Sequence, residues 1–273
     1  MKKNSVLAEK INEAEVIVLG AGAGLSAAGG LTYSGERFMR YFSDFHKKYA
    51  INDIYSGGFY HFPSEEEQWG WWCRHIYYNR YAPEPCPIYL QLFDLLCDKN
   101  YFVLTTNVDH QFIKAGFDTQ RLFATQGNYG LFQCSVPCHQ ETFDNETIIK
   151  EMIAQQSGLE IPTALLPHCP HCGEMMTPHL RKDNLFVEDS AWHEASHRYQ
   201  SFLTENQEKK VLFLELGVGF NTPGIIKIPF MQMTYQWKDA FFLSLNQELW
   251  EIPKEIKNKS LLLQGDLSAI VGH

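Results

Sequence analysis

Four cysteines in the middle of the chain have the spacing of a metal site. They form two close pairs, Cys134 with Cys138 and Cys169 with Cys172, and 30 residues separate the pairs. Two such pairs can supply four thiolates to one tetrahedral zinc at about 2.3 Å, and four thiolates leave no open position, which is typical of a structural zinc. Three histidines flank the pairs as alternatives to one thiolate: His139, His168 and His171. The simpler alternative is that the cysteines are ordinary core residues.

A glycine-rich run near the N-terminus has the composition of a phosphate-binding turn. It spans residues 20–30 and follows a short apolar run. Where a strand leads through glycines into a helix, backbone N–H groups and the positive end of the helix dipole favour a pyrophosphate. We therefore expect Gly22, Ala23 and Gly24 to lie against a dinucleotide, with the Ser26 hydroxyl nearby. The alternative is a tight turn that holds no ligand.

Polar residues follow two further apolar runs. Asn107 and Asp109 come shortly after residues 101–105, and a second glycine segment, 217–223, follows residues 211–216. In an open parallel sheet, the residues just after the carboxyl ends of the strands line the ligand crevice. Amide and carboxylate groups there suit hydrogen bonds to ribose hydroxyls and to an amide. The alternatives are helix N-capping by Asn107 or Asp109 and a plain turn at the glycine segment.

The elements that must position these residues are short apolar strands alternating with helices. Six runs are expected to be buried strands: residues 15–19, 101–105, 122–125, 211–216, 241–245 and 261–263. Helical patterns cover residues 4–14, 109–115 and the aromatic-rich segment 36–99, which three prolines interrupt. This alternation predicts an α/β fold with an open, mostly parallel sheet and helices on both faces. Residues 134–172 indicate an insertion around the cysteines.

Composition narrows the class of protein. The chain has 273 residues, of which 45% are hydrophobic and 20% are charged, so it can bury a sizeable core. Its net charge of −9, from 23 Lys and Arg against 32 Asp and Glu, argues against a nucleic-acid partner. Without an apolar stretch of about 18 residues or a leader pattern, we expect no membrane association. Seven cysteines in such a chain favour reduced thiols and a cytoplasmic location.

Taken in order, these motifs resemble the sirtuin family. The resemblance covers residues 15–270 and rests on the following segments: Gly22–Ser26, Thr106–Asp109, the Gly127 turn, the cysteine pairs, Gly217–Gly219 with Asn221, Asn246, and Gly265–Asp266. It implies a Rossmann-like, doubly wound NAD domain, a smaller domain made of a zinc module and a helical module, and consumption of NAD at the nicotinamide ribose. The implied parts are a Rossmann-like domain of residues 1–35, 100–126 and 210–273, a helical module of 36–99, a zinc module of 127–185 and a helical connection of 186–209.

Two departures from the usual sirtuin pattern indicate the branch. Gln126 stands where most sirtuins carry a histidine, and Thr32–Gly35 replaces the usual Pro-Asp-Phe-Arg stretch. With residues 215–227, these segments closely resemble the class M microbial sirtuins. That resemblance implies a protein ADP-ribosyltransferase acting on a lipoylated carrier similar to the glycine-cleavage H protein. A macrodomain ADP-ribosyl hydrolase and a lipoate ligase are its implied functional neighbours.

The resemblance also implies roles for single residues. Asn107 orients the nicotinamide ribose, Asp109 accepts from the nicotinamide carboxamide, and Arg181 binds a target carboxylate or a group near the lipoyl arm. The alternative for Arg181 is a plain surface arginine. The residues expected to bind NAD are Gly22, Ala23, Gly24, Ser26, Tyr33, Asn107, Asp109, Gln126, Gly217, Gly219, Asn221, Asn246 and Asp266.

The glutamine at position 126 decides which reaction we expect. Deacylating sirtuins need a general base at the ribose hydroxyls, and a carboxamide takes up no proton at useful pH. Loss of a general base typically costs about 10²- to 10⁴-fold in rate. An Asp or Glu acceptor has a pKa near about 4, so it attacks already ionised and needs no base. We therefore expect ADP-ribosyl transfer to an acidic side chain, with Asn107, Asp109, Gln126 and Arg181 as the catalytic residues.

Two other functions remain open from the sequence. One is an NAD-dependent lysine deacylase in which another residue replaces the base. The other is a module that binds NAD without catalysis. A deacylase would release an acyl group from lysine peptides, and a binding module would not release nicotinamide.

Overall fold

The computed structural model describes residues 3–219, 223–248 and 250–272, which fall into two compact units. The first unit contains the chain up to Gly30, Pro85–Gln126 and the chain from Ala191 onward. The second contains Leu31–Glu84 and Gly127–Ser190, so the expected helical and zinc modules form one unit.

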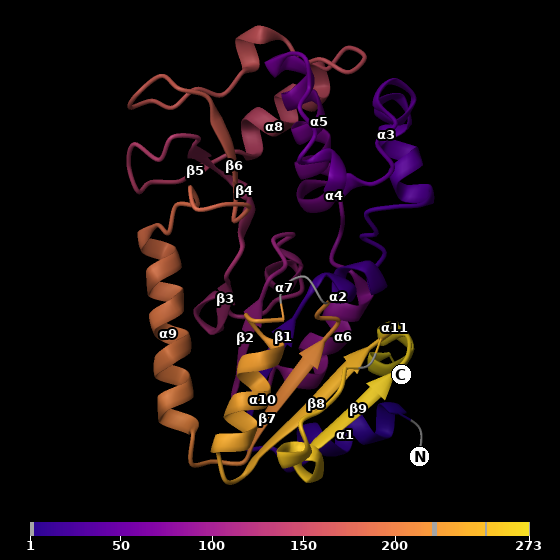
Figure 1. The fold of residues 1–273 in the computed structure, drawn as a ribbon, viewed down its shortest axis with the longest axis vertical. Coiled ribbons are helices and arrows are strands. Elements are labelled where there is room, and N and C mark those ends of the chain that lie inside the picture. Colours follow the sequence, from indigo (N-terminus) through magenta and orange to yellow (C-terminus); the bar gives the residue numbers. More distant parts are fainter. Residues whose placement is uncertain (1–2, 220–222, 249, 273) are drawn as a thin grey trace. The chain divides into compact units, whose positions relative to one another are not determined.

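A six-stranded sheet forms the centre of the first unit, and its strand order is β3-β2-β1-β7-β8-β9 (Figure 1). The strands are β1 (Val16–Ala21), β2 (Tyr101–Thr105), β3 (Leu122–Ala124), β7 (Val211–Leu216), β8 (Ala240–Asn246) and β9 (Ser260–Gln264). All neighbouring pairs are parallel. Each apolar run expected to be a strand is one, which confirms the open parallel α/β sheet.

The helices of the first unit precede, separate and follow its strands along the chain. They are α1 (Lys3–Glu13), α2 (Ala23–Ala28), α6 (Pro87–Leu96), α7 (Gln111–Lys114), α9 (Ser190–Asn206), α10 (Lys227–Gln236) and α11 (Leu267–Val271), with short 3-10 turns η2 (Thr119–Arg121) and η4 (Lys254–Lys259). Helix α7 is shorter than the expected span of 109–115, because His110 has a left-handed backbone (φ 69°) and α7 begins after it. Among the described residues, no helix has the length and apolar character to cross a membrane.

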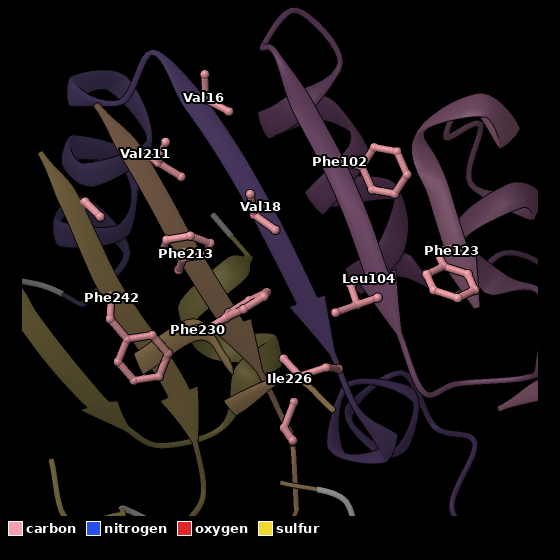
Figure 2. Packing of buried hydrophobic residues seen from close by; sticks show 12 residues of the cluster. Val16, Val18, Phe102, Leu104, Phe123, Val211, Phe213, Ile226, Phe230 and Phe242 are labelled. Carbon is pink, nitrogen blue, oxygen red and sulfur yellow. The ribbon is translucent and has the colours of Figure 1, made fainter. Parts of the chain in front are cut away.

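One face of the sheet packs against α9 and α10. Figure 2 shows buried side chains of this face, among them Phe213 of β7 and Phe230 of α10. Val16 and Val18 of β1, Phe102 of β2 and Phe213 of β7 are buried there with Phe230 of α10. Aromatic residues of α9, Trp192, Tyr199 and Phe202, cover the same cluster. These contacts explain why α9 belongs to the first unit rather than to a separate connection.

Helix α6 also groups with the sheet, although the sequence assigned residues 36–99 to the helical module. The N–H of Cys86, just before α6, donates to Gln111 Oε1 at 2.8 Å. Tyr89 of α6 contacts Ser26 and Asn107 through its hydroxyl. These bonds attach the start of α6 to the loops that follow β1 and β2.

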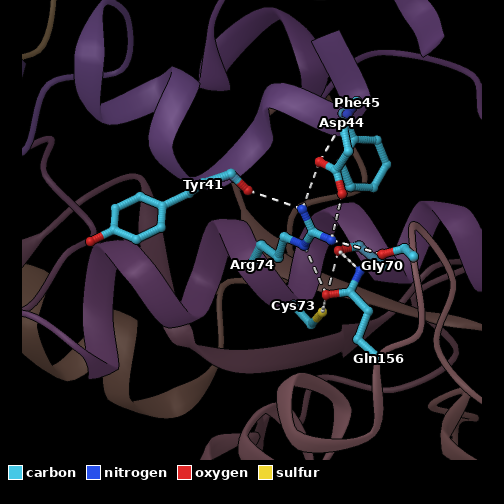
Figure 3. A network of polar contacts seen from close by, with 8 residues as sticks. Tyr41, Asp44, Phe45, Gly70, Cys73, Arg74 and Gln156 are labelled. Atoms are coloured by element: carbon cyan, nitrogen blue, oxygen red, sulfur yellow. Dashed lines mark hydrogen bonds and ion pairs between the residues drawn. The ribbon is translucent and has the colours of Figure 1, made fainter. Parts of the chain in front are cut away.

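The second unit combines helices with a small antiparallel sheet, β5-β4-β6. Its elements are α3 (Glu36–Tyr49), α4 (Ile54–Gly57), α5 (Glu65–Ile76), the π-helix η1 (Tyr77–Tyr81), β4 (Gly127–Cys134), β5 (Phe143–Asp144), α8 (Glu146–Gln155), the 3-10 turn η3 (Thr163–Leu165) and β6 (Met176–Leu180). Arg74 of α5 joins its parts: it donates to Asp44 of α3 at 2.8 Å and to Gln156, just after α8, at 2.8 Å (Figure 3).

Candidate functional site

The sheet register brings most of the predicted nucleotide-binding residues to one edge of the first unit. Thr105 pairs with Ala21 on one side and with Ala124 on the other. Asn107 and Gln126 therefore both stand two residues beyond paired positions, at the carboxyl ends of β2 and β3. The loops after β1, β7, β8 and β9 reach the same edge, which is where ligands bind in open α/β sheets.

Two glycine turns pack directly against each other at this edge. The N–H of Gly22 donates to Leu216 O at 3.0 Å, and that of Gly24 donates to Gly217 O at 2.9 Å. A Cβ on Gly22 would lie 2.7 Å from Val218 Cα, and one on Gly24 would lie 2.8 Å from Gly217 O. Gly217 has a φ of +63°. Glycine is therefore required at these positions by the contact between the two loops.

This contact changes the role expected for the glycine run. The sequence interpretation gave its N–H groups to a pyrophosphate, but those of Gly22 and Gly24 are used within the protein. Ala23, the first residue of α2, is exposed, whereas Ser26 is buried. The glycine pattern correctly signals a close backbone approach, and the approaching backbone is the loop after β7.

A directional chain of hydrogen bonds connects Asn107 to Asp109. Asn107 Nδ2 donates to Gly22 O at 3.0 Å and to the Tyr89 hydroxyl at 3.2 Å. Ser26 Oγ lies 2.7 Å from the Tyr89 hydroxyl and donates to Asp109 Oδ2 at 2.5 Å. Because the Ser26 proton is used for Asp109, the Tyr89 hydroxyl donates to Ser26. Among the described residues, no hydrogen bond reaches Asn107 Oδ1, which is left to accept from a ligand.

The N-cap residue of α7 is His110, so neither Asn107 nor Asp109 is the N-cap, although Asp109 bonds to the start of the helix. Asp109 Oδ1 accepts from the N–H of Gln111, the first residue of α7, at 3.0 Å. Both Asp109 oxygens thus have partners in the protein, although each oxygen can accept a second bond. Burial raises the pKa of Tyr89 well above its usual range, and the Asp109 carboxylate adds to the effect. Tyr89 is therefore a neutral hydroxyl at any physiological pH.

The loops after β8 and β9 hold their predicted residues in structural contacts. Asn246 Nδ2 donates to Val218 O at 2.8 Å, so it supports the turn at Gly217. Asp266 is exposed and its Oδ1 caps α11 by accepting from the N–H of Ser268 at 3.0 Å. Gly219 is exposed, and the predicted Asn221 lies outside the described residues. The roles of these residues in binding stay predictions.

Arg181 and Gln126 have different surroundings. Gln126 is partly exposed at the end of the first unit. Arg181 is an exposed residue of the second unit; its Nη2 lies 2.5 Å from Glu188 Oε1, and its guanidinium is 4.3 Å from the centre of the Phe186 ring. A target carboxylate at Arg181 would share this guanidinium with Glu188.

Tyr33 lies in the second unit at the end of a hydrogen-bonded row. Its hydroxyl is 2.8 Å from that of Tyr129, which is 2.7 Å from His75 Nε2. The His75 ring is buried and stacks on Trp72 with centroids 4.9 Å apart. Burial lowers the pKa of His75 to about 3, and the nearby Arg37 charge acts in the same direction. His75 is therefore neutral at physiological pH.

The four predicted zinc ligands come together in the second unit. Their sulfur atoms all lie within 4.8 Å of one another, with Cys134 and Cys172 3.6 Å apart and Cys138 and Cys169 3.7 Å apart. A tetrahedral zinc with bonds of about 2.3 Å needs sulfur separations of about 3.8 Å. The cluster therefore fits one zinc with no open position, as expected for a structural site.

His139 supports this cluster rather than replacing a thiolate. Its Nδ1 lies 3.1 Å from the Glu141 N–H and accepts from it, which leaves the proton on Nε2. Nε2 lies 3.3 Å from Cys169 Sγ and donates to it. A thiolate that accepts a hydrogen bond in this way is held in orientation for its metal.

Two polar side chains near the carboxyl edge of the sheet, those of Tyr89 and Glu215, were not predicted from the sequence. Tyr89 gave no local signal, since its partners are distant along the chain. Glu215 sits inside the apolar run of β7, and its carboxylate is fully buried. It accepts from the Val218 N–H at 2.7 Å, from Ser244, and pairs with Lys227 at 3.3 Å. The sequence did contain one signal for Glu215, because a charged residue inside an otherwise apolar strand indicates a buried polar contact.

Comparison with known proteins gives both relatives and a fold. No protein-family model matches the chain. It is 38% identical over 272 residues to a protein of Staphylococcus aureus named protein ADP-ribosyltransferase, covering 99% of this chain and 86% of that one. It is 30% identical over 236 residues to a protein of Fusarium oxysporum f. sp. cubense named "Probable bifunctional ADP-ribose hydrolase/ADP-ribosyltransferase", covering 82% and 39% respectively.

Among solved structures, the chain resembles sirtuins throughout its length. A Sir2 homologue mutant with 2′-O-acetyl ADP-ribose matches with a TM-score of 0.63 at 16% identity, covering 97% of this chain and 92% of that one. A Sir2 complex with p53 peptide and NAD⁺ matches with a TM-score of 0.58 at 16% identity, covering 99% and 96%. These likenesses show the fold, and the Staphylococcus relative shows the branch. The chain belongs to the protein ADP-ribosyltransferases of the sirtuin family.

Proposed function

We propose that the protein transfers ADP-ribose from NAD to an acidic side chain of a lipoylated carrier protein and releases nicotinamide. The observation that carries this proposal is the chain from Asn107 through Tyr89 and Ser26 to Asp109, which leaves Asn107 Oδ1 as an acceptor at the carboxyl edge of the sheet. An acceptor oxygen there suits a ribose hydroxyl of NAD. The name of the Staphylococcus relative supports the same reaction.

The chemistry fits a site that lacks a general base. The bond between ribose C1′ and the nicotinamide nitrogen breaks, and its electron pair leaves with nicotinamide as a neutral molecule. A carboxylate oxygen of the target forms the new bond to C1′, so no proton needs to be removed. Gln126 can donate to or accept from a ribose hydroxyl but cannot take its proton. An amine target such as lysine would need a base to remove its proton.

We also propose the identity of the carrier and of the enzymes that act with this protein. The lipoylated carrier and the lipoate ligase follow from the resemblance to class M sirtuins. A macrodomain hydrolase that reverses the modification has independent support, since the name of the Fusarium relative joins an ADP-ribose hydrolase and a transferase in one chain. We place the reaction in the cytoplasm, with zinc at the four cysteines and NAD as co-substrate.

Mass spectrometry of the carrier after reaction with isotope-labelled NAD tests the proposal. We expect one ADP-ribose on the lipoylated carrier, and removal of the label by neutral hydroxylamine, which cleaves esters of Asp and Glu. The unlipoylated carrier is the matched control for the lipoyl group. Label that resists hydroxylamine would exclude an acidic acceptor.

A second assay separates transfer from deacylation. Acyl-lysine peptides are incubated with the protein and NAD, and both nicotinamide and O-acyl-ADP-ribose are measured. We expect no O-acyl-ADP-ribose above the level of an Asn107→Ala variant. Robust formation of that product would show that the protein is a deacylase.

A further inference from the structure

Tyr89 lies where the loops after β1 and β2 meet, and its position is defined from several directions. Its side chain is fully buried, and its ring meets Phe112 edge-on with centroids 4.9 Å apart. The residue follows Pro87 in the first turn of α6, and Cys86 anchors that end of the helix to Gln111. The hydroxyl therefore has little freedom to move away from Ser26 and Asn107.

The hydroxyl of Tyr89 makes the Asn107 amide adopt one orientation. A side-chain amide can present either its oxygen or its NH₂ group in a given direction by a half-turn. Here the NH₂ group of Asn107 meets two acceptors, Gly22 O and the Tyr89 hydroxyl, whose own proton is directed to Ser26. A half-turn would break both bonds and bring Asn107 Oδ1 against Gly22 O. Two acceptors therefore hold Oδ1 toward the ligand side.

We propose that Tyr89 is a positioning residue for ADP-ribosyl transfer, which acts by holding the Asn107 amide with Oδ1 presented to a ribose hydroxyl of NAD. This inference rests on the proposed function. Tyr89 itself is buried beneath Asn107 and Ser26 and acts through them. A small error in the placement of a group that meets the reacting sugar can cost about 10²-fold in rate.

The test compares two buried tyrosines in the same unit. Tyr89→Phe removes the hydroxyl without changing the ring. Tyr101→Phe removes the hydroxyl of another buried tyrosine, whose hydrogen-bond partner in the described part of the chain is the Asp118 N–H at 3.2 Å. We expect Y89F to lower kcat for nicotinamide release about 10- to 100-fold and to change the KM for NAD less than about threefold. Y101F should lower the melting temperature similarly and leave kcat within about twofold. Equal kcat values for the two variants would overturn the inference.

A double-mutant cycle tests whether Tyr89 acts through Asn107. In an Asn107→Ala background, adding Tyr89→Phe should lower the residual kcat less than about twofold, because the group to be positioned is absent. An undiminished loss in that background would show that Tyr89 acts by another route and would overturn the proposal.

A spectroscopic readout separates this inference from the proposed function. The two side-chain NH₂ signals of Asn107 in ¹⁵N-labelled protein should move in Y89F and stay in place in Y101F, with no NAD present. If the parent protein releases no nicotinamide with any carrier, the transferase proposal fails while these signals still test Tyr89. Signals that stay in place in Y89F would overturn the positioning role even if the transferase reaction is observed.

Discussion

Asn107 and Asp109, two residues apart after β2, are connected through the hydroxyls of Tyr89 and Ser26. The connection runs through α6 and α2, so three separate elements must be in place before it forms. All of its members but Asn107 are buried. The polar edge of the sheet is therefore ordered before any ligand arrives, which is what a site needs in order to stabilise a transition state without reorganising.

The contact between the two glycine turns predicts that Gly24 tolerates no side chain. In Gly24→Ala the new Cβ would lie 2.8 Å from Gly217 O and 2.9 Å from Gly217 Cα, and backbone cannot move aside cheaply. We expect a loss of about 1–3 kcal/mol in the free energy of unfolding and a raised KM for NAD. The matched control is Gly224→Ala, where no atom of the described residues, apart from its own chain neighbours, lies within 4 Å of the new Cβ. Urea unfolding of both variants checks the difference, and equal stabilities would contradict it.

The sheet could be predicted from the sequence because its strands are fully buried. A run such as Val211–Leu216 is apolar on both faces, and this pattern identifies a parallel strand. The strands β4 and β6 could not be predicted in the same way. Their pairing is irregular between Asn128 and Phe132, and a proline, Pro178, lies in the middle of β6. Short, partly buried strands with a bulge lack a regular alternation.

The residues of the candidate site also differ in whether a local sequence pattern could identify them. The cysteine pairs and Asn107 were predicted, because metal-ligand spacing and loop position after a strand are local features. Tyr89 was not, because its contact with Ser26 joins residues 63 positions apart. Arg181 was predicted from the resemblance alone, and no local sequence pattern around it predicted its ion pair with Glu188.

The buried pair of Glu215 and Lys227 predicts a strong coupling between two substitutions. Burial raises the pKa of Glu215 and lowers that of Lys227, so each charge depends on the other. Glu215→Gln alone or Lys227→Met alone leaves one uncompensated charge in the core and should cost about 3–5 kcal/mol. The double variant should recover most of that loss, because Gln can still accept from the Val218 N–H. Unfolding in urea measures all three, and additive losses would show that the pair is not coupled.

Zinc binding predicts that loss of one thiol destabilises the second unit. We expect about one zinc per chain by elemental analysis, and loss of metal with a lower melting temperature in Cys134→Ser. The physical reason is that binding free energy of a structural zinc is folding free energy. Cys97→Ser is the matched control, since Cys97 is an exposed thiol outside the cluster. A Cys134→Ser protein that keeps its zinc and its melting temperature would refute the assignment.

The buried His75 predicts that part of the stability is lost on mild acidification. Burial lowers the pKa of His75 in the folded protein to about 3 from the ordinary 6.5. Below pH 6.5, His75 therefore binds a proton in the unfolded chain and stays neutral in the folded protein. Protonation therefore favours unfolding, and stability falls by about 2 kcal/mol between pH 7 and pH 5 from this group alone. His75→Phe keeps a ring against Trp72 and removes the titration, so its unfolding free energy should fall less steeply over that range. His61→Gln, at an exposed histidine, should keep the steep dependence of the parent protein. Urea unfolding at pH 5, 6 and 7 provides the comparison, and parallel curves for the parent and His75→Phe would show that His75 takes up its proton as readily in the folded protein as in the unfolded chain.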